Sequence, residues 1–254
     1  MKYLEELHEL KIFHKKDAVK VAGDENAAKE ILRRYKKQGL IAHVRRDLYV
    51  VTDLANKAGL ATKYEIAGQI TPSSYLSYHA ALDYHGLAHQ FFYEVSVSSN
   101  ETFNIFDYEG ISYNFYKSKS GHGVVNPATD PLVRVTDLER TLLDCIDRID
   151  LSGGLEELVN CFSIITLVDE RKLIDYLHHF NRQVLYQKTG FVLGYFQKEM
   201  RLSDTFFEIC KANTGKSIRY LTDKQESDTY FKEWKLCAPK NMLSFLEQGG
   251  TEYV

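Results

Sequence analysis

Two carboxylates three residues apart are the first residues whose type and spacing could do chemistry. Asp144 and Asp147 stand in the segment LLDCIDRI, and paired carboxylates can hold the divalent metal that a nuclease uses. The segment has the apolar spacing of a helix, and no lysine follows on a strand in the arrangement that such a nuclease needs. A metal-dependent nucleic-acid enzyme is therefore the weakest of the functions that we consider.

Tyrosines and histidines crowd the segment SSYLSYHAALDYHGL, where histidine could act as an acid–base group or a metal ligand. We predict one helix from Pro72 to about His85. The residues that would share one of its faces are Tyr75, Tyr78, His79 and Leu82. Because no third ligand follows at a suitable spacing, this pattern favours core packing with hydrogen-bonded aromatic tips. A regulator that senses a small molecule through this helix remains an alternative.

Composition and cysteine usage are typical of a soluble globular protein. Hydrophobic residues make up 44% of the chain and charged residues 26%. The sequence has no long apolar run, and its N-terminus is too polar for a signal peptide, so we expect a cytoplasmic protein without a membrane segment. The four cysteines are widely spaced without a CxxC pair, which gives no prediction of a zinc site or of any other metal site.

The stretch from Asp24 to Val51 combines a basic helix with a β-hairpin. Asp24 is suited to cap the helix, and Gly39 is suited to end it. Two short β-segments then flank the sequence Arg45-Arg46-Asp47, and two further helices precede Asp24. Three helices followed by a hairpin predict a winged helix-turn-helix that binds DNA. The alternative is an ordinary helical domain with a solvated basic face.

Charge is distributed unevenly along the chain. Residues 1–52 hold 12 Lys and Arg against 8 Asp and Glu, a net charge of +4. The remaining residues hold 20 Lys and Arg against 27 Asp and Glu, a net charge of −7. A basic N-terminal part on an acidic body indicates a protein that presents one end to nucleic acid.

We predict an α/β (α+β) fold with two domains. A winged helix-turn-helix spans residues 1–52, and a larger domain spans residues 53–254, mixed α/β over 53–150 and mainly helical over 151–254. Strands are expected at 91–98, 102–107, 111–117, 133–135 and 218–221, and residues 234–236 are expected to form another strand or a loop. Further helices are expected at 63–70, from 136 onward, through 154–213 and at 241–246.

Side chains are expected to cap three of these helices. Thr136 and Glu139 have the spacing of a capping box, in which each side chain bonds the other residue's main-chain N–H. Asp169 and Ser203 are expected to cap two later helices. The loop SKSGHG at 118–123 lacks the spacing of a phosphate-binding loop.

Three stretches together resemble the AbiEi antitoxins, the transcriptional-regulator half of type IV abortive-infection toxin–antitoxin systems. They are RRDLYVV at the end of the predicted winged helix, then SYHAALDYHGL, then VRVTDLERTLLDCIDRIDLSGGLEELVN. The resemblance covers roughly residues 5–165, and DLERTLLD after a strand is its most specific part. The chain departs from the family pattern at Asp47, where a glycine is expected.

The resemblance implies a repressor that binds inverted repeats in its own promoter as double-stranded DNA. It also implies that the larger domain counteracts a nucleotidyltransferase toxin without a stable complex, and that the chain has no enzymatic activity and no cofactor. Asn26, Lys29 and Arg33 are the candidates for contact with the major groove. The phosphate-contact candidates are Lys15, Lys16, Lys37, Arg45 and Arg46. In the larger domain, the candidates are His79, Glu139 and Arg140.

Overall fold

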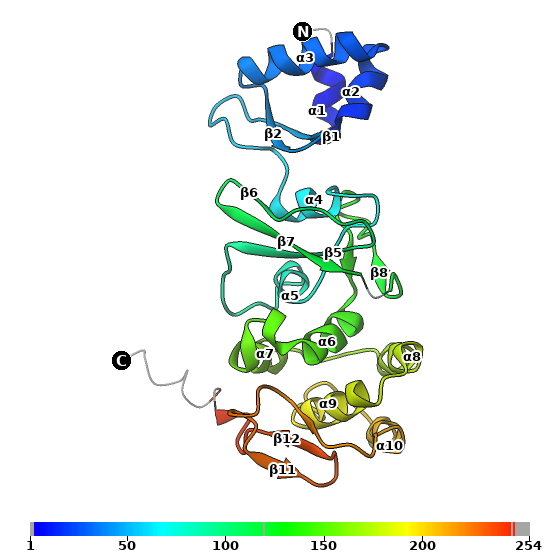
Figure 1. Cartoon of the computed structure of the whole chain (residues 1–254). Helices are drawn as coiled ribbons and strands as arrows, with labels where there is room; N and C mark the ends of the chain where they lie inside the picture. Colours follow the sequence, from blue (N-terminus) through cyan, green and yellow to red (C-terminus); the bar gives the residue numbers. More distant parts are fainter. Residues whose placement is uncertain (1–2, 119, 245, 247–254) are drawn as a thin grey trace, which may run out of the picture. The chain divides into compact units, whose positions relative to one another are not determined.

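The computed structural model describes residues 3–118, 120–244 and 246 (Figure 1). The chain forms two compact units, each assembled from separate stretches of sequence. The first consists of Met1–Leu76, Tyr93–Lys119 and Asn126–Val135, and the second of Ser77–Phe92, Ser120–Val125 and Thr136–Val254. The first unit thus joins residues 1–52 to a later part of the chain, and the predicted domain boundary after Thr52 stays a prediction.

Residues 1–52 contain the three helices and the hairpin in the predicted order, together with a strand between the first two helices that we did not predict. These elements are α1 (Leu4–Leu10), β1 (Ile12–His14), α2 (Lys15–Ala22), α3 (Glu25–Lys37), β2 (Ile41–Arg45) and β3 (Leu48–Val51). The strands form an antiparallel sheet in the order β1-β3-β2, with β2 and β3 as the predicted hairpin (Figure 1, blue). The hairpin brings its turn back to α2, because the Lys15 N–H donates to the Asp47 carbonyl at 2.9 Å.

Helix α3 begins and ends where the sequence predicts. The Asp24 carboxylate accepts a hydrogen bond from the Ala27 N–H at 2.8 Å, and Gly39 adopts a φ of +65° after the last turn. The residues that α3 buries recur at the spacing of one helix face, namely Ala28, Ile31, Leu32 and Tyr35. Burial of each large side chain contributes roughly 1.5–3 kcal/mol, which fixes the basic face outward.

The rest of the first unit is a sheet with one short helix. Its elements are α4 (Lys63–Gly68), β4 (Tyr75–Leu76), β5 (Glu94–Ser99), β6 (Phe106–Tyr108), β7 (Ile111–Lys117) and β9 (Val135–Thr136). The strands lie side by side in the order β6-β7-β5-β4-β9, with β5 and β7 parallel and β6 and β7 joined as an antiparallel hairpin. The chain is thus mixed α/β, as predicted.

The predicted helix from Pro72 to His85 is wrong in its first half. Tyr75 and Leu76 form strand β4 instead, pairing with Ser98 and Val97 of β5. Only α5 (His79–Tyr84) is helical in this segment. Pairing with a central strand outweighs the helical spacing of the aromatic residues, so Tyr75 does not share a helix face with His79.

The second unit is mainly helical, as predicted. Its helices after α5 are α6 (Leu138–Asp147), the 3₁₀ turn η1 (Ile149–Leu151), α7 (Gly154–Ser163), α8 (Glu170–Phe180), α9 (Gln183–Gly194) and α10 (Asp204–Ala212). Its strands are β8 (Val124–Val125), β10 (Arg219–Tyr220), β11 (Thr229–Phe231) and β12 (Leu236–Ala238), the last three forming a sheet in the order β10-β12-β11. None of the helices in the described ranges is both long and apolar enough to span a bilayer.

The predicted caps of α8 and α10 are confirmed, and that of α6 is corrected. Asp169 and Ser203 accept hydrogen bonds from the first turns of their helices. At α6 the cap is Asp137, which accepts from the Arg140 N–H, whereas Thr136 ends strand β9. The predicted helix at 241–246 and the loop at 118–123 include residues 245 and 119, which lie outside the described residues.

Candidate nucleic-acid interface

A hollow on the surface of the predicted winged helix, residues 1–52, gathers three of the candidate DNA-contact residues. It has a volume of about 280 Å³ and is lined by Lys15 from α2, by residues of α3 and by residues of the hairpin. The lining residues are Lys15, Lys29, Leu32, Arg33, Lys36, His43 and Tyr49. Residues of three elements thus surround one basic concavity, which is the shape that a phosphate or a base edge requires.

Sequence reasoning missed Lys36, His43 and Tyr49 as members of this concavity. Lys36 belongs to the basic run of α3 and could have been found from helical spacing to Lys29 and Arg33. His43 and Tyr49 pair across the hairpin, with ring centroids 5.1 Å apart, and only the register of the two strands shows that they face α3.

Acidic side chains partly neutralise this basic face. The Glu25 carboxylate lies 3.0 Å from the Lys15 ammonium and 3.2 Å from that of Lys29, and Glu30 lies 2.9 Å from the Arg33 guanidinium. The hydrogen bond from Lys15 lowers the pKa of Glu25 below its usual range. All five side chains reach solvent, so these ion pairs contribute little to stability and can be exchanged for a phosphate.

The remaining candidates on the two helices are accessible. Lys16 is exposed in the first turn of α2, and Asn26 and Lys37 are exposed near the two ends of α3. Their placement agrees with contact to a surface outside the protein.

The hairpin turn is formed by Arg46 and Asp47. Arg46 has 92% of its side chain exposed, and its Nε lies 3.7 Å from the Asp47 carboxylate. Asp47 adopts a φ of +61°, in the left-handed region that favours glycine. The position therefore has the backbone conformation for which we expected a glycine, and aspartate is among the residues that tolerate it.

Arg45 is placed differently from the other candidates. Its guanidinium lies 5.2 Å from the ring centroids of both Phe103 and Phe106, which belong to the same unit. Its Nη1 is buried without a hydrogen-bond partner in the described part of the chain, and burial lowers the pKa of Arg45. Arg45 therefore packs the hairpin against the sheet and is not available at the turn.

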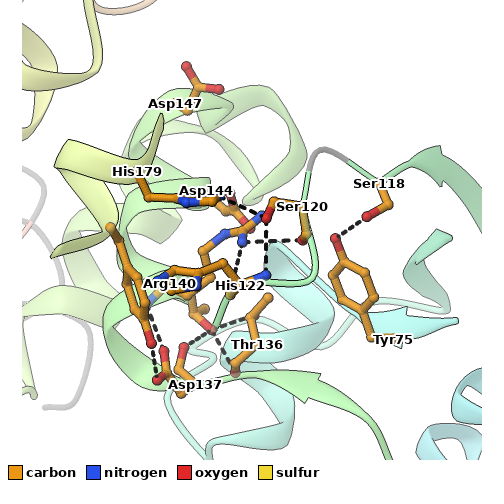
Figure 2. Close-up of polar contacts among 12 residues, drawn as sticks. Tyr75, Ser118, Ser120, His122, Thr136, Asp137, Arg140, Asp144, Asp147 and His179 are labelled. Atoms are coloured by element: carbon orange, nitrogen blue, oxygen red, sulfur yellow. Dashed lines mark hydrogen bonds and ion pairs between the residues drawn. The ribbon is translucent and has the colours of Figure 1, made fainter. Parts of the chain in front are cut away.

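Arg140, a candidate in the larger domain, is a buried structural residue. Its side chain is 1% exposed, and its Nε donates to the Asp144 carboxylate at 2.9 Å (Figure 2). Its Nη1 donates to the His122 carbonyl, and its guanidinium lies 4.5 Å from the centre of the Phe180 ring. Arg140 thus fastens α6 to the segment before β8 and to the end of α8.

Glu139 and the capping residue Asp137 join α6 to α8. The Glu139 carboxylate accepts from the Asp169 N–H at 2.8 Å, in place of the capping-box contact that we predicted. Asp137 accepts from the Tyr176 hydroxyl at 2.6 Å and from the Lys172 ammonium at 3.1 Å. The motif DLERTLLD therefore supplies a polar network inside the second unit, and its partners lie too far along the chain to be found from the sequence.

His79 is buried as well. Its Nε2 lies 3.1 Å from Oε1 of Glu157, which also accepts from the main-chain N–H groups of His89 and Gln90. The His79 and Phe92 rings also meet edge to face, with centroids 4.2 Å apart. The core-packing interpretation of this histidine therefore agrees with its surroundings, and none of the three candidates of the larger domain is exposed.

Both carboxylates that we considered for metal binding already pair with arginine side chains. Asp144 pairs with Arg140, and Asp147 pairs with the Arg182 guanidinium at 2.6 Å. Asp144 is also buried beside Arg140. Across the described ranges, no group of three or more His, Cys, Asp or Glu residues is arranged to hold a metal ion.

The elements define a mixed α/β protein with a basic helical N-terminal part, and comparison with solved structures agrees with this fold. The chain is similar to the crystal structure of the Rv2827c protein from Mycobacterium tuberculosis, with a TM-score of 0.63 and 11% sequence identity. The match covers 98% of this chain and 94% of the other. No family model and no curated protein matches the sequence. At this identity the similarity shows the fold alone.

Proposed function

We propose that this chain is a transcriptional repressor that binds double-stranded DNA through residues 1–52. The observation that carries the proposal is the basic concavity formed by α2, α3 and the hairpin, with Lys15, Lys29 and Arg33 around it. Three elements that meet in this way offer a helix for the major groove and flanking cations for the phosphate strands. The net charge of +4 on residues 1–52 attracts DNA.

The candidate residues divide into two roles. Arg33 and Asn26 have side chains that can make paired hydrogen bonds with guanine and adenine edges, and Lys29 can contact either a base or a phosphate. Phosphate contacts are assigned to the exposed cations Lys15, Lys16, Lys37 and Arg46. Glu25 and Glu30 are displaced from their lysine and arginine partners when DNA binds.

Arg45 has a structural role and does not contact DNA. Its packing against Phe103 and Phe106 fixes the hairpin relative to the sheet of the same unit. A fixed hairpin holds the main chain of Arg46 in one position, which lowers the entropy cost of a phosphate contact at the turn.

We further propose that the repressor is the antitoxin of a type IV toxin–antitoxin system. The support is the resemblance of three stretches to the AbiEi antitoxins, and their order along the chain. The partner would be a nucleotidyltransferase toxin, and the DNA would be inverted repeats in the chain's own promoter. Because His79, Glu139 and Arg140 are buried, the surface that counteracts the toxin consists of other residues of the larger domain.

DNA binding is tested by fluorescence anisotropy with a labelled duplex from the region upstream of the gene. Replacing Arg33 by alanine is expected to cost about 1–3 kcal/mol of binding and to relax sequence preference, because a base contact is lost. Lys198→Ala, which removes an exposed charge from the second unit, is the matched control and should leave affinity unchanged. Equal affinity of Arg33→Ala and the parent chain for the upstream duplex would remove Arg33 from the interface.

The antitoxin role is tested by growth rescue. The proposal predicts a nucleotidyltransferase gene next to this one, and its product is expressed from an inducible promoter, with or without this chain from a second, independent promoter. We expect the chain to restore growth, and Arg33→Ala to restore it equally while failing to repress a reporter. Loss of rescue in Arg33→Ala at equal protein level would contradict the separation of the two activities, and no rescue by the parent chain would refute the antitoxin role.

A further inference from the structure

A second hollow in the first unit is lined by α2, by Glu25 of α3 and Asp47 of the hairpin turn, and by residues of α4 and later segments that do not line the basic concavity. It has a volume of about 820 Å³. One wall is formed by α2 with His14 and Asp47, and the opposite wall by the end of α4 with the segment to Pro72 and by Arg134. The volume lies in the range of pockets that hold nucleotide-sized molecules.

The wall that contains Arg134 is held tightly. A Cβ on Gly68 would lie 2.5 Å from the Leu132 carbonyl oxygen, so only glycine allows α4 to pack this closely. The Gln69 side chain donates to the same carbonyl at 2.9 Å, and Nη1 of Arg134 donates to the Pro72 carbonyl at 2.6 Å. The guanidinium is therefore positioned before any ligand arrives.

An ion pair also joins the N-terminal part of the unit, which contains α2, to α4. The Lys11 ammonium, from the residue before β1, lies 3.3 Å from the Glu65 carboxylate of α4. Glu65 is buried and is fixed by its capping box with Thr62, with hydrogen bonds of 2.7 and 3.1 Å. The hollow thus has two braced walls within one unit.

The charges that face the hollow leave a positive surplus. Each of its acidic side chains already has a basic partner: Asp17 with Lys20 at 3.3 Å, Glu25 with Lys15 at 3.0 Å and Asp47 with Arg46 at 3.7 Å. Lys16 and Arg134 line the same hollow, and neither has an acidic partner within the described part of the chain. These two cations come from opposite walls.

We propose that this hollow binds a nucleoside phosphate, with the phosphate group between Lys16 and Arg134. Arginine and lysine are the side chains that recognise phosphate, arginine through paired hydrogen bonds. A phosphate ion alone would fill a small part of the volume. Val19 and Pro72 offer apolar surface in the remaining space, where a base can lie.

Occupation of the hollow controls DNA binding, a consequence that rests on the proposed function. Lys15 lines both hollows, and Lys16 is a phosphate-contact residue of the DNA surface. A nucleotide that engages these side chains competes with DNA for them. By linkage, nucleotide and DNA each weaken the binding of the other by the same factor.

The site itself is tested without DNA, by isothermal titration calorimetry of the full chain with ATP, GTP, CTP and UTP. At least one triphosphate should bind, whereas adenosine, which lacks the phosphates, should not. Arg134→Gln and, independently, Lys16→Gln are each expected to weaken binding about tenfold or more, because a charge-assisted hydrogen bond is lost. Arg171→Gln, an exposed arginine of the second unit, should bind like the parent chain.

Two results would overturn the site. One is the absence of binding heat for all four triphosphates up to about 1 mM, which corresponds to a negligible affinity. The other is binding that neither variant weakens, with circular dichroism showing both variants folded. Because neither result involves DNA, failure of the nucleotide site is distinguishable from failure of the proposed repressor function.

The coupling is tested by anisotropy with the upstream duplex at constant ionic strength. The triphosphate that binds should raise the apparent Kd for DNA in the parent chain and have no effect in Arg134→Gln. Without nucleotide, Arg134→Gln should bind DNA like the parent. If it instead weakens DNA binding and lowers the salt slope by about one, the hollow holds a phosphate of DNA itself, and the nucleotide proposal is wrong.

Discussion

Arg140 places a charged guanidinium inside the second unit, where it contacts a carboxylate, a carbonyl and an aromatic ring. Replacing it by methionine leaves the Asp144 carboxylate buried without this partner and removes the donor to the His122 carbonyl. We expect a loss of about 3–5 kcal/mol in the free energy of unfolding, because a buried carboxylate that loses its arginine is costly. Urea unfolding followed by the fluorescence of Trp234, which is the only tryptophan and lies in the same unit, measures it.

A double replacement separates the charge effect from packing. Arg140→Met combined with Asp144→Leu should recover much of the lost stability, since the buried carboxylate is then removed together with its arginine. Arg171→Ala serves as the control and should change stability by less than about 0.5 kcal/mol, as is usual for exposed sites. A loss below about 1 kcal/mol for Arg140→Met would contradict the structural role of this arginine.

His14 gives the first unit a dependence on pH. Burial, reinforced by the nearby Lys16 ammonium, lowers the pKa of His14 below its ordinary value. The neutral ring is thus favoured in the folded chain, so its contribution to stability is complete above the unfolded pKa of about 6.5 and is lost as pH falls toward the folded pKa.

The pH effect is measured by urea unfolding with circular dichroism at pH 7.5 and pH 5.5. His14→Asn, which cannot titrate, should lose less stability between the two pH values than the parent chain does. His8→Asn, on the exposed side of α1, should lose as much as the parent. An equal loss in His14→Asn and the parent would show that this histidine does not titrate with unfolding.

At the scale of elements, the end of α4 depends on the absence of a side chain at Gly68. Gly68→Ala would set a Cβ 2.5 Å from the Leu132 carbonyl oxygen, and the helix would have to move away. We expect a loss of about 1–3 kcal/mol in the free energy of unfolding, typical of overpacking. Gly194→Ala, at the end of α9, meets nothing closer than the Phe207 ring at 3.9 Å.

The two glycines make a matched comparison in thermal or urea unfolding. Both end a helix, so the helix propensity gained with alanine is similar, and only the space differs. Gly194→Ala should be neutral or slightly stabilising, by up to about 1 kcal/mol. If both substitutions changed the free energy of unfolding equally, the close packing of α4 against residues 132–134 would not contribute to stability.

Local patterns predicted the helices whose signals lie within the helix itself. Helix α3 follows from Asp24, the apolar spacing of Ile31 and Tyr35, and Gly39. The caps at Asp169 and Ser203 follow from residue type and position alone. These elements need no information from distant parts of the chain.

The predictions that were wrong concern residues whose partners lie far away in the sequence. Tyr75 and Leu76 have a helical spacing to later residues, but β5 offers them strand partners from a distant part of the chain. Arg45 is expected at the hairpin tip until Phe103 and Phe106 are seen beside its guanidinium. The sequence around Tyr75, Leu76 and Arg45 does not indicate which distant residues these side chains contact.

At the scale of the whole molecule, the chain crosses between its two units several times. Local composition marks the basic part at residues 1–52, but it cannot show that this part shares a unit with residues 93–119 and 126–135. The charge asymmetry of the sequence and the basic concavity point to the same end of the chain. That interface and the nucleotide hollow both adjoin α2, which makes this helix the element through which a small molecule could act on DNA binding.

The salt dependence of binding to the upstream duplex tests the central claim most directly. Anisotropy titrations over a range of KCl concentrations give log K against log salt, and about four phosphate contacts, from Lys15, Lys16, Lys37 and Arg46, predict a slope of about −4 per bound chain. Lys16→Gln should lower this slope by about one, whereas Lys198→Gln should leave it unchanged. A slope near zero for the parent chain would contradict DNA binding through residues 1–52.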